Sequence, residues 1–391
     1  MEGFPRGLLR RPPQARLAHF AAYTIGHATI QATLAAVVRA ITHPRDTWTP
    51  VILVIGPAGV GKTTLIRAAE RDLTRRLRRE LATNPGRFPF VSMTSDVPET
   101  GSFSWKDFCI SSLEALHEPL VRHKLDLPAP PLGTAPDVPV GLRPRTSASV
   151  LRRALIAALS QRAPAAFFVD EAQQMAMVTG ARTFQHQMDY LKRLADASSV
   201  PIVLVGNYDL CLLRNQSAQL GRRTVDVHFR RYDATRLQDQ ADFKDVVLSF
   251  QYHLPLAEQP DLLSVWDYLY LRSVGCIGLL KTWLLVALAR TVETGEATIT
   301  RAALERAAPP ASKSKKVLEE ALDGEAALAE LDEAADPRAA EEELRALLRL
   351  SPSAGPAPAP AALGQKRGRR PAERAPVRAA VGPAGPAERT G

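Results

Sequence analysis

One run of residues carries the strongest chemical signal in the chain. The complete pattern GxxxxGK[ST] is formed by Gly56, Pro57, Ala58, Gly59, Val60, Gly61, Lys62, Thr63 and Thr64. Glycines in such a run let backbone N–H groups converge on phosphate oxygens, and a helix that begins there points its positive end at them. Lys62 is expected to reach the β- and γ-phosphates, and the Thr63 hydroxyl to bind Mg²⁺. The run therefore predicts a P-loop that binds ATP with magnesium.

Two carboxylates follow a second apolar segment, at residues 165–169. Asp170 is expected to hold the metal ion through water, and Glu171 to polarise the attacking water. An Asp-Glu pair is common in loops, so its meaning depends on the P-loop. Together the two motifs favour hydrolysis of ATP over binding alone.

Further positions are candidates for sensing the nucleotide. Asn207 ends a third apolar segment and is expected to orient the lytic water, with a turn-forming asparagine as the alternative. Arg222 and Arg223 are candidates to act in trans on a neighbouring subunit's nucleotide, with Arg214 or a solvated basic turn as alternatives. Lys281 opens a later helix and is a candidate to contact the γ-phosphate in cis, unless it is a surface lysine.

The elements that would position these residues alternate between strand and helix. Short apolar, β-branched segments predict strands at 51–55, 88–93, 165–169, 201–205 and 225–229. Helical spacing of apolar residues predicts helices at 28–41, 63–81, 104–116, 148–161 and 183–197. This alternation predicts an α/β fold with a parallel, doubly wound sheet, whose ligands lie at the carboxyl ends of the strands.

Changes in composition divide the chain into four parts. Residues 1–14 are expected to be disordered, 15–235 to form the nucleotide-binding α/β part, and 236–308 to form a small α-helical lid. Residues 309–391 combine an acidic helical segment with a basic, Pro/Ala-rich tail that is expected to be disordered. A Pro-rich stretch at 125–144 is expected to be a loop or insertion.

Overall composition narrows the class of protein. The chain has 391 residues and a formal net charge of +9, which indicates either a polyanionic partner such as nucleic acid or an arginine-rich codon usage. Cys109, Cys211 and Cys276 stand far apart, which argues against a disulfide framework or a structural zinc site. No apolar run is long enough to cross a bilayer, and the N-terminus lacks the apolar segment of a secretory signal. We therefore expect a cytoplasmic protein with no membrane contact.

The set GPAGVGKTT, FFVDEAQQM, VLVGN and QLGRR, followed by YLRSVGCIGLLKTWLLVAL, resembles the TniB/TnsC family of AAA+ ATPase regulators of DNA transposition, which is related to MuB and IstB. The segment from Phe20 to His27 also resembles that family's approach to the P-loop. The likeness spans about Ala15 to Ala307. It implies an AAA+ P-loop NTPase fold with a parallel five-stranded sheet, a small α-helical lid and a disordered C-terminal tail.

The resemblance also implies a function. It implies ATP-dependent assembly on double-stranded DNA, as a ring or helical filament, in the bacterial cytoplasm at the nucleoid. Such an assembly would select the target site and activate a DDE transposase, with a targeting factor of the TniQ type or a CRISPR-associated complex as partner. The DNA-facing elements of this group tend to lie between the second strand and the Asp-Glu strand. The basic residues of that region are Lys106, Arg122, Lys124, Arg143 and Arg145.

Two other functions remain open at this point. One is a helicase loader or replication initiator that also depends on ATP and DNA. The other is a signalling NTPase switch that oligomerises without DNA. A metabolic P-loop kinase is disfavoured because Glu171 and the predicted lid fit hydrolysis and assembly better.

Overall fold

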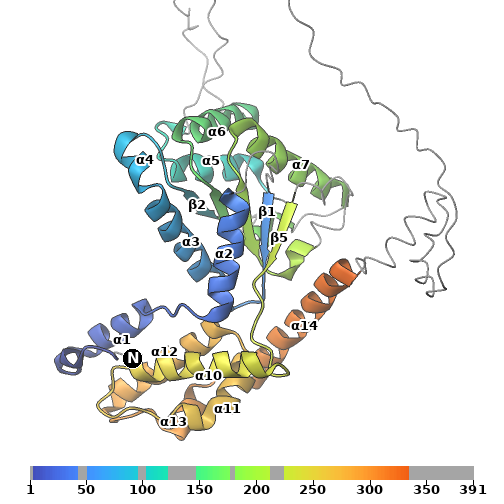
Figure 1. Ribbon diagram of the computed structural model, residues 1–391. Coiled ribbons are helices and arrows are strands. Elements are labelled where there is room, and N and C mark those ends of the chain that lie inside the picture. The colour runs from blue at the N-terminus through green and yellow to red at the C-terminus, as the bar shows by residue number, and fades with distance from the viewer. Residues whose placement is uncertain are drawn as a thin grey trace, which may run out of the picture. The chain divides into compact units, whose positions relative to one another are not determined.

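Figure 1 shows a computed structural model of the chain, which describes residues 3–42, 51–95, 103–121, 147–176, 181–211 and 224–333. The predicted tail beyond residue 333 and the whole Pro-rich stretch at 125–144 lie outside the described residues. The described residues form one compact unit that ends at Glu333.

A parallel sheet of five strands forms the centre of this unit, in the order β2-β3-β4-β1-β5. The strands are β1 (Val51–Ile55), β2 (Val91–Thr94), β3 (Phe167–Asp170), β4 (Ile202–Gly206) and β5 (Thr224–His228). β1 lies between β4 and β5, with Val51 opposite both Ile202 and Thr224. Every residue of β1 is buried, as a strand covered on both faces requires. The predicted five-stranded parallel α/β fold is confirmed.

Helices cover both faces of the sheet. α2 (Ala28–Thr42) and α3 (Lys62–Arg76) pack with Ile52 and Val54 in one buried cluster, and the short α4 (Arg78–Thr83) follows α3. Alternate side chains of β1 enter the cluster on the opposite face, because successive strand residues point to opposite sides. That second face is covered by α5 (Trp105–Ala115), α6 (Ala148–Arg162) and α7 (Ala181–Ser198).

A helical lid with its own core follows the sheet. Its elements are α10 (Leu237–His253), η6 (Leu263–Val265), α11 (Trp266–Ser273), α12 (Ile277–Thr294) and α13 (Arg301–Ala307). Phe243, Phe250 and Leu284 are buried in this core, which is separate from the two clusters against the sheet. A long helix, α14 (Ala311–Glu333), comes next (Figure 1).

The N-terminal segment differs from its prediction in two respects. Residues 6–10, expected to be disordered, form a short 3-10 helix, η1 (Arg6–Arg10), which follows a hydrogen bond from the Phe4 N–H to the Tyr252 carbonyl at 3.4 Å. α1 (Pro13–Ala22), expected to belong to the nucleotide-binding part, places Phe20 fully inside the lid core. Both differences depend on contacts with residues more than two hundred positions away, which local composition does not reveal.

Among the described residues, no single helix is long and apolar enough to cross a bilayer. Leu263–Ser273 together with Ile277–Thr294 reaches that length and composition, but only as a pair bent by 115°.

Candidate nucleotide site

The P-loop connects the buried end of β1 to the first turn of α3. Gly61 precedes α3 with a φ of 117°, a left-handed conformation that favours glycine. At Gly56 a Cβ atom would collide with the carbonyl oxygen of Phe229, which follows β5. The sequence pattern is therefore also a steric requirement of this connection.

Lys62 is buried at the start of α3. Its ammonium donates hydrogen bonds to the carbonyl oxygens of Gly56 and Pro57, each at 3.0 Å. Burial lowers the pKa of Lys62, while the carboxylates of Glu171 and Asp170 act in the opposite direction. The cation therefore lies inside the loop and within electrostatic reach of the predicted Asp-Glu pair.

A hydrogen bond joins the two halves of the predicted magnesium site. The Thr63 hydroxyl of α3 donates to Oδ2 of Asp170, at the end of β3, at 2.8 Å. The other carboxylate oxygen of Asp170 accepts the Glu171 N–H at 2.9 Å. A hydroxyl and a carboxylate are hard oxygen donors of the kind Mg²⁺ takes alongside water and phosphate. Among the described residues, no group of three or more His, Cys, Asp or Glu could hold a metal ion.

Glu171 adopts a left-handed backbone conformation, with a φ of 52°. Such a φ is uncommon outside glycine and is found where the surrounding structure holds it in place. The Glu171 carboxylate accepts a hydrogen bond from the side-chain amide of Gln173, in the short helix η4 (Ala172–Ala176). The carbonyl oxygen of the same amide accepts the backbone N–H of Asn207 at 3.3 Å. Gln173 therefore links the predicted catalytic carboxylate to the end of β4, a role that sequence reasoning missed.

The Asn207 side chain is engaged in a turn. Its Oδ1 accepts the Asp209 N–H at 3.1 Å and its Nδ2 donates to the Asp209 carboxylate at 2.9 Å, which caps η5 (Tyr208–Leu210). This geometry is that of a turn-forming asparagine. Asn207 nevertheless lies at the carboxyl end of β4, next to β1, so a role towards the nucleotide stays a prediction.

The first turn of α12 contacts the P-loop. The Leu279 N–H donates to the Gly59 carbonyl at 3.1 Å, and a Cβ at Gly278 would crowd the same carbonyl. The ammonium of Lys281 instead donates to the Ala21 carbonyl of α1 at 2.6 Å. Burial lowers the pKa of Lys281, and the nearby cation Arg67 of α3 lowers it further. Lys281 thus connects the lid to α1 in this structure, and a contact with the γ-phosphate stays a prediction.

Most of the predicted trans-acting and DNA-facing cations lie outside the described residues, namely Arg122, Lys124, Arg143, Arg145, Arg214, Arg222 and Arg223. Lys106 is described. It lies in the first turn of α5 and is exposed.

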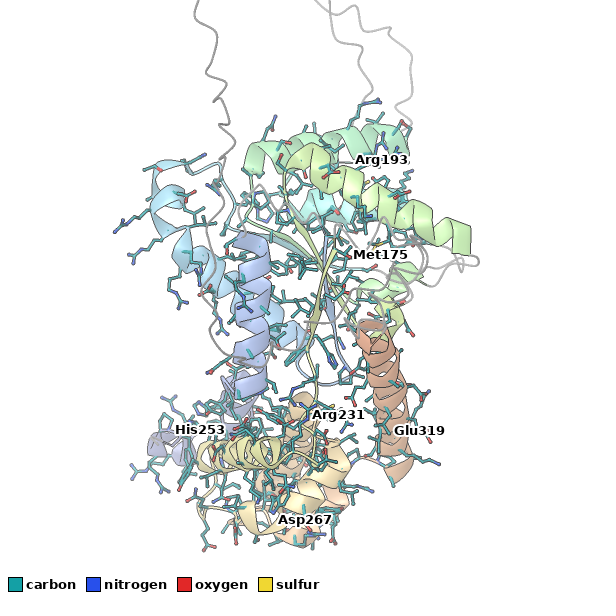
Figure 2. The ribbon with its side chains drawn as sticks, turned by 45° about the vertical axis from the view of Figure 1, so that its right-hand side comes forward. Met175, Arg193, Arg231, His253, Asp267 and Glu319 are labelled. Atoms are coloured by element: carbon teal, nitrogen blue, oxygen red, sulfur yellow. The ribbon has the colours of Figure 1, made fainter. Side chains whose placement is uncertain are left out.

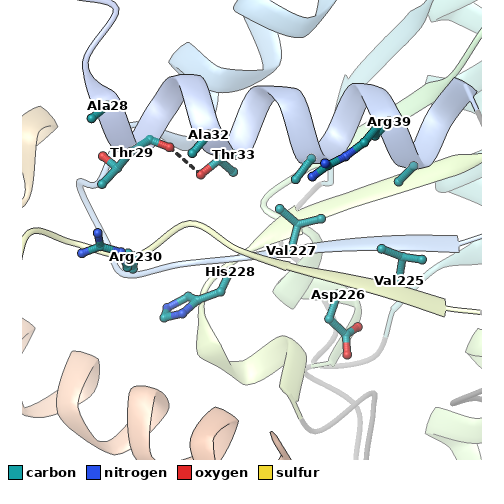
Figure 3. A pocket seen from close by; sticks show the side chains of 12 residues that line it. Ala28, Thr29, Ala32, Thr33, Arg39, Val225, Asp226, Val227, His228 and Arg230 are labelled. Carbon is teal, nitrogen blue, oxygen red and sulfur yellow. Dashed lines mark hydrogen bonds between the residues drawn. The ribbon is translucent and has the colours of Figure 1, made fainter.

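A cavity of about 600 Å³ lies between α2 and β5 (Figure 3). Its lining includes Ala32, Val227 and Arg230, and no residue of the P-loop or of the Asp-Glu pair. The cavity and the predicted nucleotide site therefore share no lining residue.

Residues 48–213 match the family model of the AAA domain. No curated protein matches the chain. Similar solved structures include the ORC2 protein of Aeropyrum pernix, at 14% identity and a TM-score of 0.47, over 75% of this chain and 70% of that chain. The ORC1 protein of Aeropyrum pernix, in complex with DNA, gives 16% identity and a TM-score of 0.45, over 76% and 68%. Domain III of the Thermotoga maritima replication initiation protein DnaA gives 14% identity and a TM-score of 0.36, over 77% of this chain and 95% of that chain.

At these identities and TM-scores, the likenesses to solved structures carry no argument about activity or partners. The family match covers the P-loop, the Asp-Glu pair and the strands β1 to β4. Residues 48–213 therefore match the AAA domain, and the chain has the AAA+ P-loop fold.

Proposed function

We propose that this chain is an AAA+ ATPase that binds ATP with Mg²⁺ and hydrolyses it to ADP and phosphate. The observation that carries the proposal is the 2.8 Å hydrogen bond between Thr63 and Asp170, residues 107 positions apart. It brings the P-loop hydroxyl, the acidic end of β3 and the buried Lys62 into one site. A glycine-rich turn with no catalytic role would not require this convergence.

The roles of the residues follow from their chemistry. The P-loop N–H groups and Lys62 bind the phosphate oxygens and offset their negative charge. Thr63 and Asp170 would hold a magnesium ion, which neutralises charge on the β- and γ-phosphates when bound. Glu171 accepts a proton from the attacking water while the water oxygen bonds to the γ-phosphorus. The bond between the γ-phosphorus and the β–γ bridging oxygen breaks, and ADP leaves.

Two substitutions test this proposal. Lys62→Ala should abolish measurable nucleotide binding, because it removes the buried cation that the phosphates require. Glu171→Gln should bind ATP normally but lower turnover by roughly 10²–10⁴-fold, the range for loss of a general base. Nucleotide binding and phosphate release are the measurements, and Glu320→Gln, an exposed carboxylate on α14, is the matched control. Normal turnover by Glu171→Gln would show that another group activates the water.

We propose further that ATP controls assembly of this chain on double-stranded DNA during transposition. The support is the resemblance to the TniB/TnsC family and the formal net charge of +9. In this proposal the chain acts in the bacterial cytoplasm, forms a ring or filament, and activates a DDE transposase. A TniQ-type factor or a CRISPR-associated complex would direct it to the target.

A helicase loader or replication initiator would also depend on ATP and DNA. It would differ from the transposition proposal only in its partner. A stimulation assay separates the two. Stimulation of strand transfer by a co-encoded transposase supports the transposition proposal, whereas loading of a replicative helicase would contradict it.

A further inference from the structure

A partly buried ion pair joins the segment that follows β5 to α14. Arg231 lies three residues after β5, and Glu325 lies on α14, 94 positions later. Nη2 of Arg231 donates to Oε2 of Glu325 at 3.0 Å, and Nε lies 2.9 Å from Oε1. The Arg231 side chain is only 9% exposed and that of Glu325 27%. Figure 2 places Arg231 between the sheet and the lid helices, with α14 beside them.

Arg231 and the P-loop cation Lys62 both act electrostatically on the same buried residue. The Tyr232 N–H donates to the Gly275 carbonyl at 3.1 Å, which brings the chain after β5 against the start of α12. Cys276 lies there, fully buried, and burial raises the pKa of its thiol to about 12. Both Arg231 and Lys62 oppose that rise, so both cations lie within electrostatic reach of this one thiol.

α14 also contacts the end of β4, beside the predicted water-orienting position. Gly324 lies so close to Tyr208 that a Cβ there would collide with the tyrosine ring. Tyr208 directly follows Asn207, and burial raises its pKa, with Glu325 contributing in the same direction. α14 therefore lies against the residue that follows Asn207, at the carboxyl ends of the strands, where such sheets bind their ligands.

The ion pair has a physical cost that calls for an explanation. A guanidinium taken out of water requires a hydrogen-bonded anionic partner, and Glu325 supplies one. The planar guanidinium can bind either a carboxylate or a phosphate through two parallel hydrogen bonds, because each group presents a pair of oxygens. A terminal phosphate bound in the P-loop would bring more negative charge to this edge than one carboxylate does.

We propose that Arg231 is a further phosphate-binding residue of the ATP site, and that Glu325 of α14 occupies it until the γ-phosphate takes its place. This inference rests on the proposed ATPase function and names a residue beyond the P-loop and the Asp-Glu pair. The exchange of partners releases α14 from Tyr208. The position of α14 therefore differs between the ATP-bound chain and the nucleotide-free or ADP-bound chain.

The first test compares Glu325→Gln with Glu320→Gln on the same helix, in the full chain. The measurement is the dissociation constant for ATPγS and for ADP. Glu325→Gln should bind ATPγS roughly tenfold more tightly, because a competing charge-assisted hydrogen bond is removed, and should bind ADP as the wild type does. Glu320→Gln should leave both constants unchanged. Equal ATPγS affinity of Glu325→Gln and Glu320→Gln, within twofold, would overturn the inference.

A charge exchange separates phosphate binding from a structural role. The preference for ATPγS over ADP, expressed as the ratio of the two dissociation constants, should fall roughly tenfold in Arg231→Gln. The double variant Arg231→Glu with Glu325→Arg should restore the ion pair and the thermal midpoint, but not the preference. Restored preference in the double variant would show that Arg231 only holds α14.

Nucleotide binding by the wild type and by Lys62→Ala separates the ATPase proposal from the inference about Arg231 and Glu325. A wild-type chain that binds no nucleotide would overturn the ATPase proposal, and this inference with it. A wild type that binds ATPγS through Lys62 but is unaffected by Glu325→Gln would overturn this inference alone.

Discussion

At the scale of single residues, Gln173 is the feature that the local pattern conceals. Its amide donates to Glu171 and accepts from the backbone of Asn207, so one buried side chain spans the ends of β3 and β4. A hydrogen bond from a neutral amide orients the Glu171 carboxylate without neutralising it. Gln173 is therefore a positioning residue for the carboxylate that we propose to activate water.

Replacing Gln173 tests this role. Gln173→Ala should lower kcat about tenfold and leave KM for ATP nearly unchanged, because it frees Glu171 without touching the phosphate-binding groups. Gln173→Glu should lower kcat more at neutral pH and shift its pH profile to higher pH, since a second carboxylate beside Glu171 raises the pKa of the pair. Steady-state kinetics across pH measure both. An unchanged kcat in Gln173→Ala would show that Glu171 needs no such support.

At the scale of elements, the segment between α1 and α2 is attached to the lid by a buried histidine. Nδ1 of His27 lies 3.0 Å from the Tyr232 hydroxyl and 2.9 Å from the Thr29 hydroxyl. Burial lowers the pKa of His27 from 6.5 to about 4, and Asp242 offsets this only in part. The fold therefore holds this imidazole neutral at the point where the segment, β5 and the lid meet.

The depressed pKa of His27 predicts a loss of stability in acid. The unfolded chain takes up a proton near pH 6.5 while the folded chain resists until about pH 4, so acid favours unfolding across that window. Through His27, the free energy of unfolding falls by on the order of 3 kcal/mol as the pH falls across this range. Urea unfolding of the wild type and of His27→Gln between pH 7 and pH 4 measures it. The variant should lose less stability than the wild type, and equal losses would contradict the assignment.

At the scale of the whole molecule, the proposed DNA contact is an electrostatic property. The net charge of +9 includes Lys106, exposed in the first turn of α5, and further cations outside the described residues. A surface that neutralises phosphates releases counterions, so its affinity for DNA falls steeply as salt rises. This behaviour distinguishes backbone contact from the reading of particular bases.

Binding to duplex DNA should require ATP and weaken with salt. Lys106→Ala should reduce the slope of log affinity against log salt by about 1, the loss of one phosphate contact, whereas Lys316→Ala on α14 should leave it unchanged. Fluorescence anisotropy in the presence of a non-hydrolysable ATP analogue measures the slope. An absence of DNA binding at low salt would favour the signalling switch.

The sequence by itself determined the strands and the core of the nucleotide site. Five apolar segments predicted the five parallel strands, and the pattern at Gly56 to Thr64 placed the phosphate loop between β1 and α3. β2 begins at Val91 and not at residue 88, because Pro89 has no N–H to donate to a ladder. These features follow from residues close together in the chain, where alternation, glycine and proline act directly on the backbone.

The tertiary structure alone decided which distant residues meet. It placed Phe20 in the lid core, Lys281 on the Ala21 carbonyl, and Glu325 against Arg231. No local pattern marks these contacts, because each depends on how helices far apart in sequence pack together. The position of Gln173 in the sequence likewise does not show that its amide reaches the end of β4. The chemistry of the phosphate loop is thus a local property of the sequence, whereas the connections between that loop, the lid and α14 are a property of the fold.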